Sequence, residues 1–234
     1  AFEKSSAFVA NDSFFMREMG IDISPGERTF SEVLSSRWLI PNCVDTYLFS
    51  PSGEGEGMDI IVPRNLYFSR GIHLAIEAFQ QIRDDLPSSR LLIIGGMGDS
   101  RYALRLFRRV KELGLQDKVF FLGHIPWEKM REIYQRAGIC LIPSIFGEGT
   151  SLSALEAMAS GVATISTSIG GLADLPTIKC LPNPFSLAEK ILEVYPKRKE
   201  IGRWQREKVS INFSLNLWRQ AFLKVVKFTL KGGE

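Results

Sequence analysis

Two carboxylates, Glu148 and Glu156, stand eight residues apart in the stretch PSIFGEGTSLSALEAMASG, which spans residues 143–161. We expect this stretch to run from the end of a buried strand, through a glycine-containing loop, into a helix over 151–160. The first turn of a helix has backbone N–H groups without intrahelical partners, so such a loop gathers donors next to the two acids. The stretch is therefore the first candidate for a ligand-binding site.

The start of this predicted helix is a candidate phosphate site. The backbone N–H groups of Thr150, Ser151 and Leu152 would point out of its N-terminus, where the helix dipole favours an anion. Gly147 and Gly149 lack side chains and would let the backbone approach a ligand closely.

Glu156 lies at the edge of the inward stripe that Leu152, Leu155 and Ala159 form on the predicted helix. An unpaired carboxylate is costly at such a position, so Glu156 needs hydrogen-bond donors. The ribose hydroxyls of a nucleotide would supply them. The alternative is a surface glutamate on a slightly rotated helix, and Glu148 could likewise be a solvated turn residue.

Two arginines, Arg64 and Arg70, bracket the loop between a predicted strand over 58–62 and a predicted helix over 71–86. A guanidinium can bind a diphosphate through two hydrogen bonds and can neutralise the charge that develops on a leaving group. The alternative is a pair of exposed surface arginines.

Three further loops follow predicted strands and could bring backbone groups to a sugar, a phosphate or a base. Their candidate contact residues are Gly96, His124, Ile125, Gly170 and Gly171. Each signal is weak alone, because Gly–Gly pairs are usually turns and a lone histidine is usually an ordinary loop residue.

Short apolar runs alternate with helical patterns along most of the chain. Strands are predicted over 58–62, 90–94, 118–122, 139–142, 162–166 and 177–181. Helices are predicted over 71–86, 100–113, 127–137, 151–160 and from 186 onward, where Ser186–Glu189 reads as a capping box. This alternation predicts an α/β fold, a Rossmann-like parallel sheet with helices on both faces, which binds ligands at the carboxyl ends of its strands.

Composition is that of a soluble globular protein, with 45% hydrophobic and 24% charged residues among 234. The formal charge of +3 is too small to indicate nucleic acid, but it suits an anionic small ligand. The three cysteines lack metal-binding spacing, which indicates free thiols in a reducing compartment and a cytoplasmic protein. No metal site is predicted.

Four segments together resemble one known family, the retaining GT-B glycosyltransferases of the group 1, or family 4, type. Residues 148–161 are similar to its paired-glutamate motif and the EAMA-x-G run. Residues 41–49, PNCVDTYLF, resemble the segment that joins its two domains. Residues 113–123 resemble the stretch before its nucleotide-base loop, and residues 168–171 resemble its diphosphate and sugar loop.

The resemblance implies a role for each matching residue. Glu156 would hold the ribose hydroxyls of a nucleoside-diphosphate sugar such as a UDP- or GDP-sugar, and Glu148 would contact the donor sugar. Arg64 and Arg70 would stabilise the leaving diphosphate, so no metal or other cofactor is expected. The donor would also meet Gly149, Thr150, Ser151, Leu152, Gly96, His124, Ile125, Gly170 and Gly171.

The chain also departs from the family pattern. Asn65 stands where the family usually has Arg before Leu66, and Arg64 comes one position earlier. Cys43 stands where glycine is usual, and the acidic residue expected after Gly–Gly is delayed to Asp174.

The resemblance divides the chain into four parts. Residues 1–40 would be a remnant of an N-terminal acceptor domain, with a strand over 7–10, a helix over 13–19 and a surface excursion over 22–36. The others would be an interdomain linker (41–57), the donor-binding domain (58–212) and a C-terminal helix that packs back across the domains (213–234). The basic face of that last helix could instead contact anionic lipid, as a peripheral protein at the inner membrane face.

The predicted function is transfer of a hexosyl group, with retention, from a nucleotide sugar to a glycan, lipid-linked or small-molecule acceptor. This chain would supply the donor-binding half, and on its own it should bind the donor better than it transfers the sugar. The alternative is a non-catalytic nucleotide-binding module that acts with a partner chain. A dinucleotide reductase would need G-x-G-x-x-G after the first strand, where residues 63–66 read PRNL.

Overall fold

The computed structural model describes residues 6–26, 30–52 and 57–231. Its centre is a six-stranded sheet in the order β6-β5-β4-β7-β8-β9, and every neighbouring pair is parallel. The strands are β4 (Asp59–Val62), β5 (Leu91–Ile94), β6 (Val119–Gly123), β7 (Ala137–Ile142), β8 (Ala163–Thr167) and β9 (Ile178–Cys180). All six predicted strands form, and the predicted α/β Rossmann-like class is confirmed.

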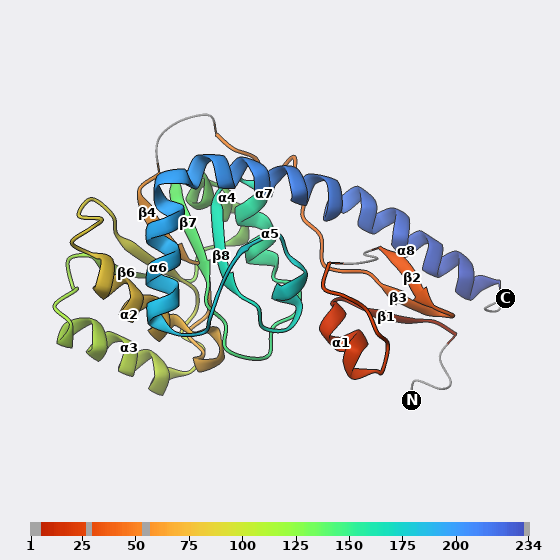
Figure 1. Cartoon of the computed structure of the whole chain (residues 1–234), viewed down its shortest axis with the longest axis horizontal. Coiled ribbons are helices and arrows are strands. Elements are labelled where there is room, and N and C mark those ends of the chain that lie inside the picture. Colours follow the sequence, from red (N-terminus) through yellow and green to blue (C-terminus); the bar gives the residue numbers. More distant parts are fainter. Residues whose placement is uncertain (1–5, 27–29, 53–56, 232–234) are drawn as a thin grey trace.

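Helices cover both faces of this sheet (Figure 1). One face packs against α2 (Ile72–Ile82), α3 (Ser100–Glu112) and α6 (Pro184–Val194). The other face packs against α4 (Trp127–Arg136), α5 (Leu152–Ala159) and α7 (Arg198–Asn212). Along β4 the buried side chains alternate, with Ile60 and Val62 on the first face and Ile61 on the second, as a two-sided sheet requires.

The strand order reverses between β4 and β7. The chain passes from β4 to β5 and β6 on one side, then from β7 to β8 and β9 on the other. In open parallel sheets, such a switch point leaves a crevice outside the carboxyl ends of the strands, where ligands bind. The loops after β4 and β7 carry Arg64 and Glu148, so this topology brings the predicted site residues to one edge.

The capping box predicted at Ser186–Glu189 is wrong. α6 begins two residues earlier, at Pro184, and its N-cap is Asn183, whose side chain accepts a hydrogen bond from the backbone N of Ser186 at 2.9 Å. Proline suits the first helical position because its fixed φ is helical and its missing N–H would lack an intrahelical partner there. The start signal was therefore Asn-Pro rather than the serine.

The N-terminal residues form a small unit of their own. It contains β1 (Phe8–Ala10), α1 (Ser13–Glu18), β2 (Ser31–Leu34) and β3 (Arg37–Leu39). β3 pairs with β1 in parallel and with β2 in an antiparallel hairpin whose turn places Ser36 at a φ of 59°. The surface excursion predicted over 22–36 is therefore wrong for residues 31–34. In this edge strand Ser31 and Val33 are half buried and Glu32 and Leu34 are exposed, so it lacks the buried apolar run by which the other strands were predicted.

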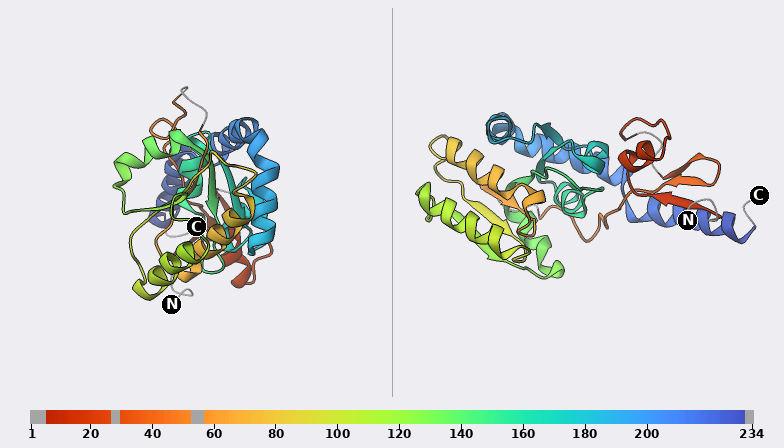
Figure 2. Two further views of the ribbon diagram at one scale, coloured as in Figure 1. Left: turned by 90° about the vertical axis from the view of Figure 1, so that its left-hand side faces the viewer. Right: turned by 90° about the horizontal axis from the view of Figure 1, so that it is seen from below.

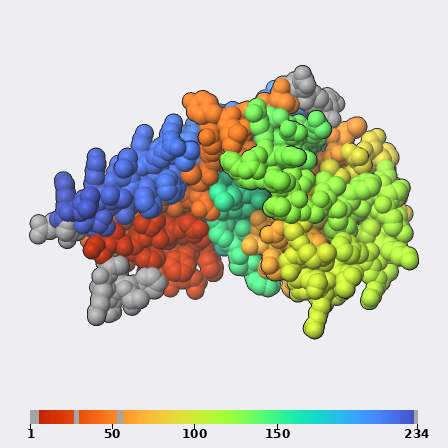
Figure 3. Space-filling model, turned by 180° about the vertical axis from the view of Figure 1, so that it is seen from behind, coloured from red at the N-terminus to blue at the C-terminus, as the bar shows by residue number. Residues whose placement is uncertain are grey.

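Helix α8 (Leu215–Leu230) runs along this small sheet, as the right-hand view in Figure 2 shows. Ala221 and Val225 pack against Trp38 and Ile40, and the ring of Phe228 meets that of Trp38 edge-on at 6.2 Å. In Figure 3 the N-terminal residues and α8 form one lobe beside the larger α/β unit. Of the linker predicted over 41–57, residues 53–56 lie outside the described residues.

A buried carboxylate joins the small unit to the large one. Asp174, at the end of the 3₁₀ turn η3 (Gly170–Asp174), accepts hydrogen bonds from Ser13 N at 2.7 Å, Ser13 Oγ at 2.5 Å and Gly26 N at 2.9 Å. Asp174 is the acidic residue that stands later than usual after the Gly–Gly pair. It thus caps the start of α1 across the junction between the small unit and the large one.

Candidate functional site

A cleft of about 360 Å³ lies at the carboxyl ends of β4, β5 and β6. This volume is within the range of small-molecule sites. Loops after these strands form one wall, and the side chains of α4 and α5 form the other. The lining residues are Pro63, Arg64, Asn65, Tyr67, Arg70, Ile94, Gly95, His124, Ile125, Trp127, Met130, Tyr134, Leu152, Ser153 and Glu156.

Arg64 and Arg70 line the cationic end of the cleft, and Glu148, which does not itself line the cleft, contacts both of them. Both guanidiniums form ion pairs with the same oxygen of Glu148, Oε2. Arg64 is only 8% exposed, and it also donates to Ser151 Oγ and Ser144 Oγ, each at 3.2 Å. Two cations and one anion leave a formal charge of +1, so this end still attracts an anion.

Burial and charge act against each other at Arg64. Loss of solvent lowers the pKa of its guanidinium, and the neighbouring Glu148 carboxylate opposes that shift. Within the described residues, Arg64 Nε is buried without a hydrogen-bond partner. A buried donor of this kind is costly, which favours a site completed by a ligand or by water.

The loop that carries Glu148 is held from behind by η3. The backbone N of Gly171 donates to Glu148 O at 2.9 Å, and a Cβ on Gly170 would collide with the same carbonyl oxygen. Gly170 has a φ of 55°, a second reason for glycine here. Lys179 supports η3 in turn, because its ammonium donates to Leu172 O and, at 2.9 Å, to Leu175 O.

Helix α5 begins beside the cationic end of the cleft. Its N-cap is Ser151, whose Oγ accepts a hydrogen bond from Ala154 N at 3.4 Å and also receives Arg64. Thr150 is turned away from the cleft, since its hydroxyl accepts from Asn42 N at 2.9 Å and donates to Asn11 O at 3.1 Å. The first turn of α5 thus adds the positive end of a helix dipole to the two arginines.

The other end of the cleft holds Glu156 among aromatic side chains. Its two oxygens accept hydrogen bonds from Trp127 Nε1 at 2.8 Å and from Tyr134 OH at 3.0 Å. Phe49 packs edge-on against both rings, with centroids 5.5 and 5.9 Å apart. Burial raises the pKa of Glu156, and these two hydrogen bonds oppose the rise.

Glu156 is 9% exposed, so the alternative of a surface glutamate is excluded. The protein itself supplies two of the donors that the sequence analysis assigned to a ligand. A carboxylate has about four acceptor sites, however, so Glu156 can still receive ligand hydroxyls.

The other predicted contact residues divide into two groups. His124, Ile125 and Leu152 line the cleft. Gly96 does not line it, since Gly95 takes that place, while Gly96 N donates to Asn65 Oδ1 at 2.8 Å. Behind the wall of the cleft lie Gly149, Thr150, Ser151, Gly170 and Gly171.

Trp127 and Tyr134 were missed in the sequence. They stand seven residues apart, two turns along α4, so they share one helix face. Each combines an apolar ring with a single polar atom that needs a partner when buried. The sequence did indicate that Glu156 needs hydrogen-bond donors. Nothing in the sequence, however, identifies these two residues as the donors.

In the described part of the chain, no group of three or more His, Cys, Asp or Glu side chains gathers in a way that could hold a metal ion. None of the helices found there is both long and apolar enough to cross a bilayer.

The parallel sheet with helices on both faces matches the Rossmann-like fold of GT-B glycosyltransferases. A crystal structure of a glycosyltransferase from Rickettsia africae ESF-5 superposes with a TM-score of 0.79 at 21% identity, covering 97% of this chain and 64% of the other. Anabaena Alr3699/HepE in complex with UDP gives 0.78 at 18% identity, over 95% and 64%.

The chain belongs to the family of group 1 glycosyl transferases, whose model matches residues 49–177. Among its relatives, a phosphatidylinositol N-acetylglucosaminyltransferase subunit from Arabidopsis thaliana is 29% identical over 187 residues, 72% of this chain. The mannosylfructose-phosphate synthase of Agrobacterium fabrum is 36% identical over 122 residues, 50% of this chain. The chain spans 41% and 27% of these two relatives, less than half of each.

Proposed function

We propose that this chain is the donor-binding half of a glycosyltransferase and that its cleft holds a nucleoside-diphosphate sugar. The observation that carries the proposal is the convergence of Arg64 and Arg70 on one carboxylate at the start of α5. Such a concentration of positive charge beside a helix N-terminus suits a diphosphate.

The two ends of the cleft suit the two chemical parts of this ligand. The diphosphate would lie against Arg64 and Arg70, where the guanidiniums stabilise the charge of the leaving group without a metal ion. The ribose would lie by Glu156, which accepts from its hydroxyls. Glu148 would face the donor sugar near the reacting carbon, held there by its two cations.

The reaction would move a hexosyl group to the hydroxyl of a glycan, lipid-linked or small-molecule acceptor with retention of configuration. The C–O bond between the sugar and the diphosphate breaks, and a bond to the acceptor oxygen forms on the same face. The nucleoside diphosphate leaves and takes up the proton of the acceptor hydroxyl. Because the chain spans less than half of its relatives, the acceptor side would come from further chain or from a partner.

The first test is calorimetric titration of the chain with UDP, GDP and ADP, each with and without EDTA. We expect one nucleotide to bind with a Kd on the order of micromolar, a free energy of about −8 kcal/mol, and EDTA to leave this value unchanged. If none of the three binds, or if chelation abolishes binding, the proposed metal-independent site is wrong.

The second test adds a candidate first domain, or a partner chain, together with the matching nucleotide sugar and a panel of acceptors. Transfer with an unchanged anomeric configuration, read by NMR coupling constants, supports the proposal. An inverted product contradicts retention. Nucleotide binding without transfer in any combination would favour the non-catalytic module instead.

A further inference from the structure

The side chain of Lys179 ties the short turn η3 to the large sheet. Lys179 lies in β9, the strand at one edge of that sheet, and its ammonium reaches back to the turn that precedes the strand. The ammonium donates to Leu172 O, to Leu175 O at 2.9 Å and to Thr177 Oγ1 at 2.6 Å. A lysine ammonium has three donors, so these three acceptors use all of them.

The turn η3 is a short element that gains from such support. It has five residues, and the hydrogen bonds that close it are long, 3.1 Å from Leu172 N to Ile169 O and 3.2 Å from Leu175 N to Leu172 O. Short 3₁₀ turns have poorer hydrogen-bond geometry than α-helices. Lys179 binds one carbonyl inside the turn and one directly after it, so it holds the turn at two points.

The turn η3 also packs directly against the backbone of the loop that carries Glu148. Gly171 N donates to Glu148 O at 2.9 Å. A Cβ on Gly170 would collide with Glu148 O, and a Cβ on Gly171 would lie 2.5 Å from Gly149 C. Backbone meets backbone here with no side chain between them, so a shift of η3 would shift Glu148 with it.

We propose that Lys179 is a positioning residue for Glu148. By fixing η3, Lys179 keeps in place the loop from which the Glu148 carboxylate reaches Arg64 and Arg70. Lys179 does not line the cleft proposed to hold the donor (the donor cleft), so it acts through the loop and not by contact with a ligand. The effect on a donor sugar rests on the proposed function, whereas the hold of Lys179 on the loop does not.

The first test titrates the variant Lys179→Met with nucleotides and with the corresponding nucleotide sugars. Methionine is an unbranched, apolar side chain without N–H donors. The probes are UDP with UDP-glucose, GDP with GDP-mannose and ADP with ADP-glucose. We expect the nucleotide affinity to stay within about twofold. The nucleotide-sugar affinity should fall about fivefold, because Glu148 faces the sugar. Equal losses for both, or no loss for either, would overturn the proposal.

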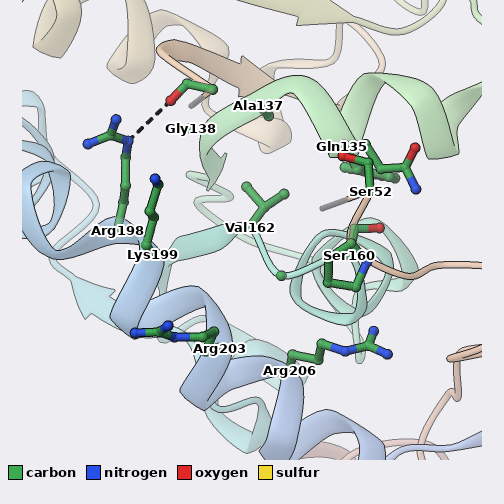
Figure 4. A pocket seen from close by; sticks show the side chains of 14 residues that line it. Ser52, Gln135, Ala137, Gly138, Ser160, Val162, Arg198, Lys199, Arg203 and Arg206 are labelled. Atoms are coloured by element: carbon green, nitrogen blue, oxygen red, sulfur yellow. Dashed lines mark hydrogen bonds between the residues drawn. The ribbon is translucent and has the colours of Figure 1, made fainter. Parts of the chain in front are cut away.

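Two lysines at the amino ends of the strands are controls for the loss of a cation. Lys118, directly before β6, is half-buried and also donates to a backbone carbonyl, Pro87 O at 2.5 Å. Lys199 is exposed and lines a separate cleft of about 390 Å³ beside the amino ends of β7 and β8 (Figure 4). Lys118→Met and Lys199→Met should leave the ratio of the two affinities unchanged. A change as large as that in Lys179→Met would contradict a specific role for Lys179.

The second test needs no ligand. Hydrogen exchange, measured by NMR, follows the amide of Gly171, whose N–H donates to Glu148 O. In Lys179→Met we expect this amide to exchange at least about tenfold faster, because η3 opens more often. The amide of Gly95, which donates to Gly123 O at 2.8 Å, should keep its wild-type rate. An unchanged rate at Gly171 would overturn the positioning role even if nucleotides bind. Faster exchange in a chain that binds no nucleotide would support the hold on the loop and refute the proposed function.

The wild-type chain gives a third measurement, which does not depend on a variant that folds. Burial lowers the pKa of the Lys179 ammonium to about 8, and the groups that oppose this shift are Asp174, at the end of η3, and Cys180, next in β9. The pKa of the Cys180 thiol, on which Lys190 of α6 also acts, is raised to about 11, so this thiol stays protonated when Lys179 loses its proton. Between neutral pH and about pH 9.5 Lys179 thus gives up one of its three donors. The exchange rate of Gly171, corrected for base catalysis, should rise about threefold over this range. Should Lys179→Met fail to fold, a constant corrected rate would overturn the proposal.

Discussion

Glu156 lines the cleft proposed to hold the donor, and Glu148 pairs with the two arginines that line its other end. Both carboxylates are buried, yet they are stabilised in opposite ways. Glu148 meets two guanidiniums, Arg64 and Arg70. Glu156 meets two neutral donors, the indole N–H of Trp127 and the hydroxyl of Tyr134. One end of the cleft is therefore cationic with its acid neutralised, and the other is an acid that keeps its full negative charge when ionised.

This difference in charge determines which part of a ligand each end of the cleft would favour. A diphosphate gains from the net positive charge at Glu148 and would be repelled by Glu156. Neutral hydroxyls gain most from an ionised carboxylate that has lone pairs to spare, because such hydrogen bonds are stronger than those between neutral groups. Under the proposed function, this contrast would orient a nucleotide sugar along the cleft, with its ribose at the aromatic end.

The largest effect is expected from Arg64→Ala, which removes the buried cation. We expect nucleotide affinity to fall roughly hundredfold, about 3 kcal/mol, because the diphosphate would then face Glu148 with only Arg70 to neutralise it. Calorimetry checks the affinity, and circular dichroism checks that the variant folds.

Arg90→Ala is the control for this variant. Arg90 also pairs with an acid, Asp59 at 2.6 Å, but it is exposed and lies at the amino end of β5. It should leave nucleotide affinity within twofold, about 0.4 kcal/mol. Equal losses in the two variants would show that general charge, rather than the cationic end of the cleft, governs binding.

The sequence made the cationic end easier to predict than the aromatic end. Arg64 and Glu148 lie in the loops that follow the apolar strands β4 and β7, and parallel strands place such loops at one edge of the sheet. Trp127 and Tyr134 sit on the outer helix α4, and their contact with Glu156 depends on how α4 and α5 pack. Helix packing of this kind has no local sequence signal, which explains why the partners of Glu156 were missed.

The elements of the fold likewise divide into those with a local sequence signal and those without one. Strands β4, β5, β7 and β8 of the large sheet were predictable because each is a short, buried apolar run. Strands β6 and β9, at the two edges of that sheet, are only partly buried. Strand β2 was not predictable, because an edge strand with alternate residues exposed resembles a surface loop. Asp174 could be singled out as a displaced acid, but its role as a cap for α1 depends on the junction between the two lobes.

The second prediction concerns Glu156, whose pKa is raised by burial. Glu156→Gln should weaken nucleotide binding about tenfold at neutral pH, about 1.4 kcal/mol, because a neutral amide accepts more weakly from ribose hydroxyls. In the wild-type chain the affinity should fall as pH drops through the raised pKa, above the ordinary value of 4.5. The variant should lack this dependence.

The substitution Glu156→Gln should change the stability of the fold in the opposite direction to the nucleotide affinity. A carboxyl whose pKa is higher in the folded chain stabilises the fold below the unfolded pKa, and that contribution is lost as pH rises through the folded pKa. At neutral pH Glu156 is therefore retained at a cost to stability. Glu156→Gln should melt at the same or a higher temperature than wild type, and a marked fall would assign Glu156 a structural role instead.

The smallest effect is expected from Trp127→Phe, which keeps the ring but removes the indole N–H. The hydrogen bond from Trp127 lowers the pKa of Glu156, so its loss should raise that pKa further and move the midpoint of the pH dependence of binding upward. Affinity at neutral pH should fall only about threefold, about 0.7 kcal/mol, since Tyr134 still orients the carboxylate. The control is Trp204→Phe, at a half-exposed tryptophan of α7 outside the donor cleft. A midpoint that stays in place in Trp127→Phe would mean that the neutral donors do not set the charge of Glu156, and the contrast between the two ends of the cleft would then rest on Arg64 and Arg70 alone.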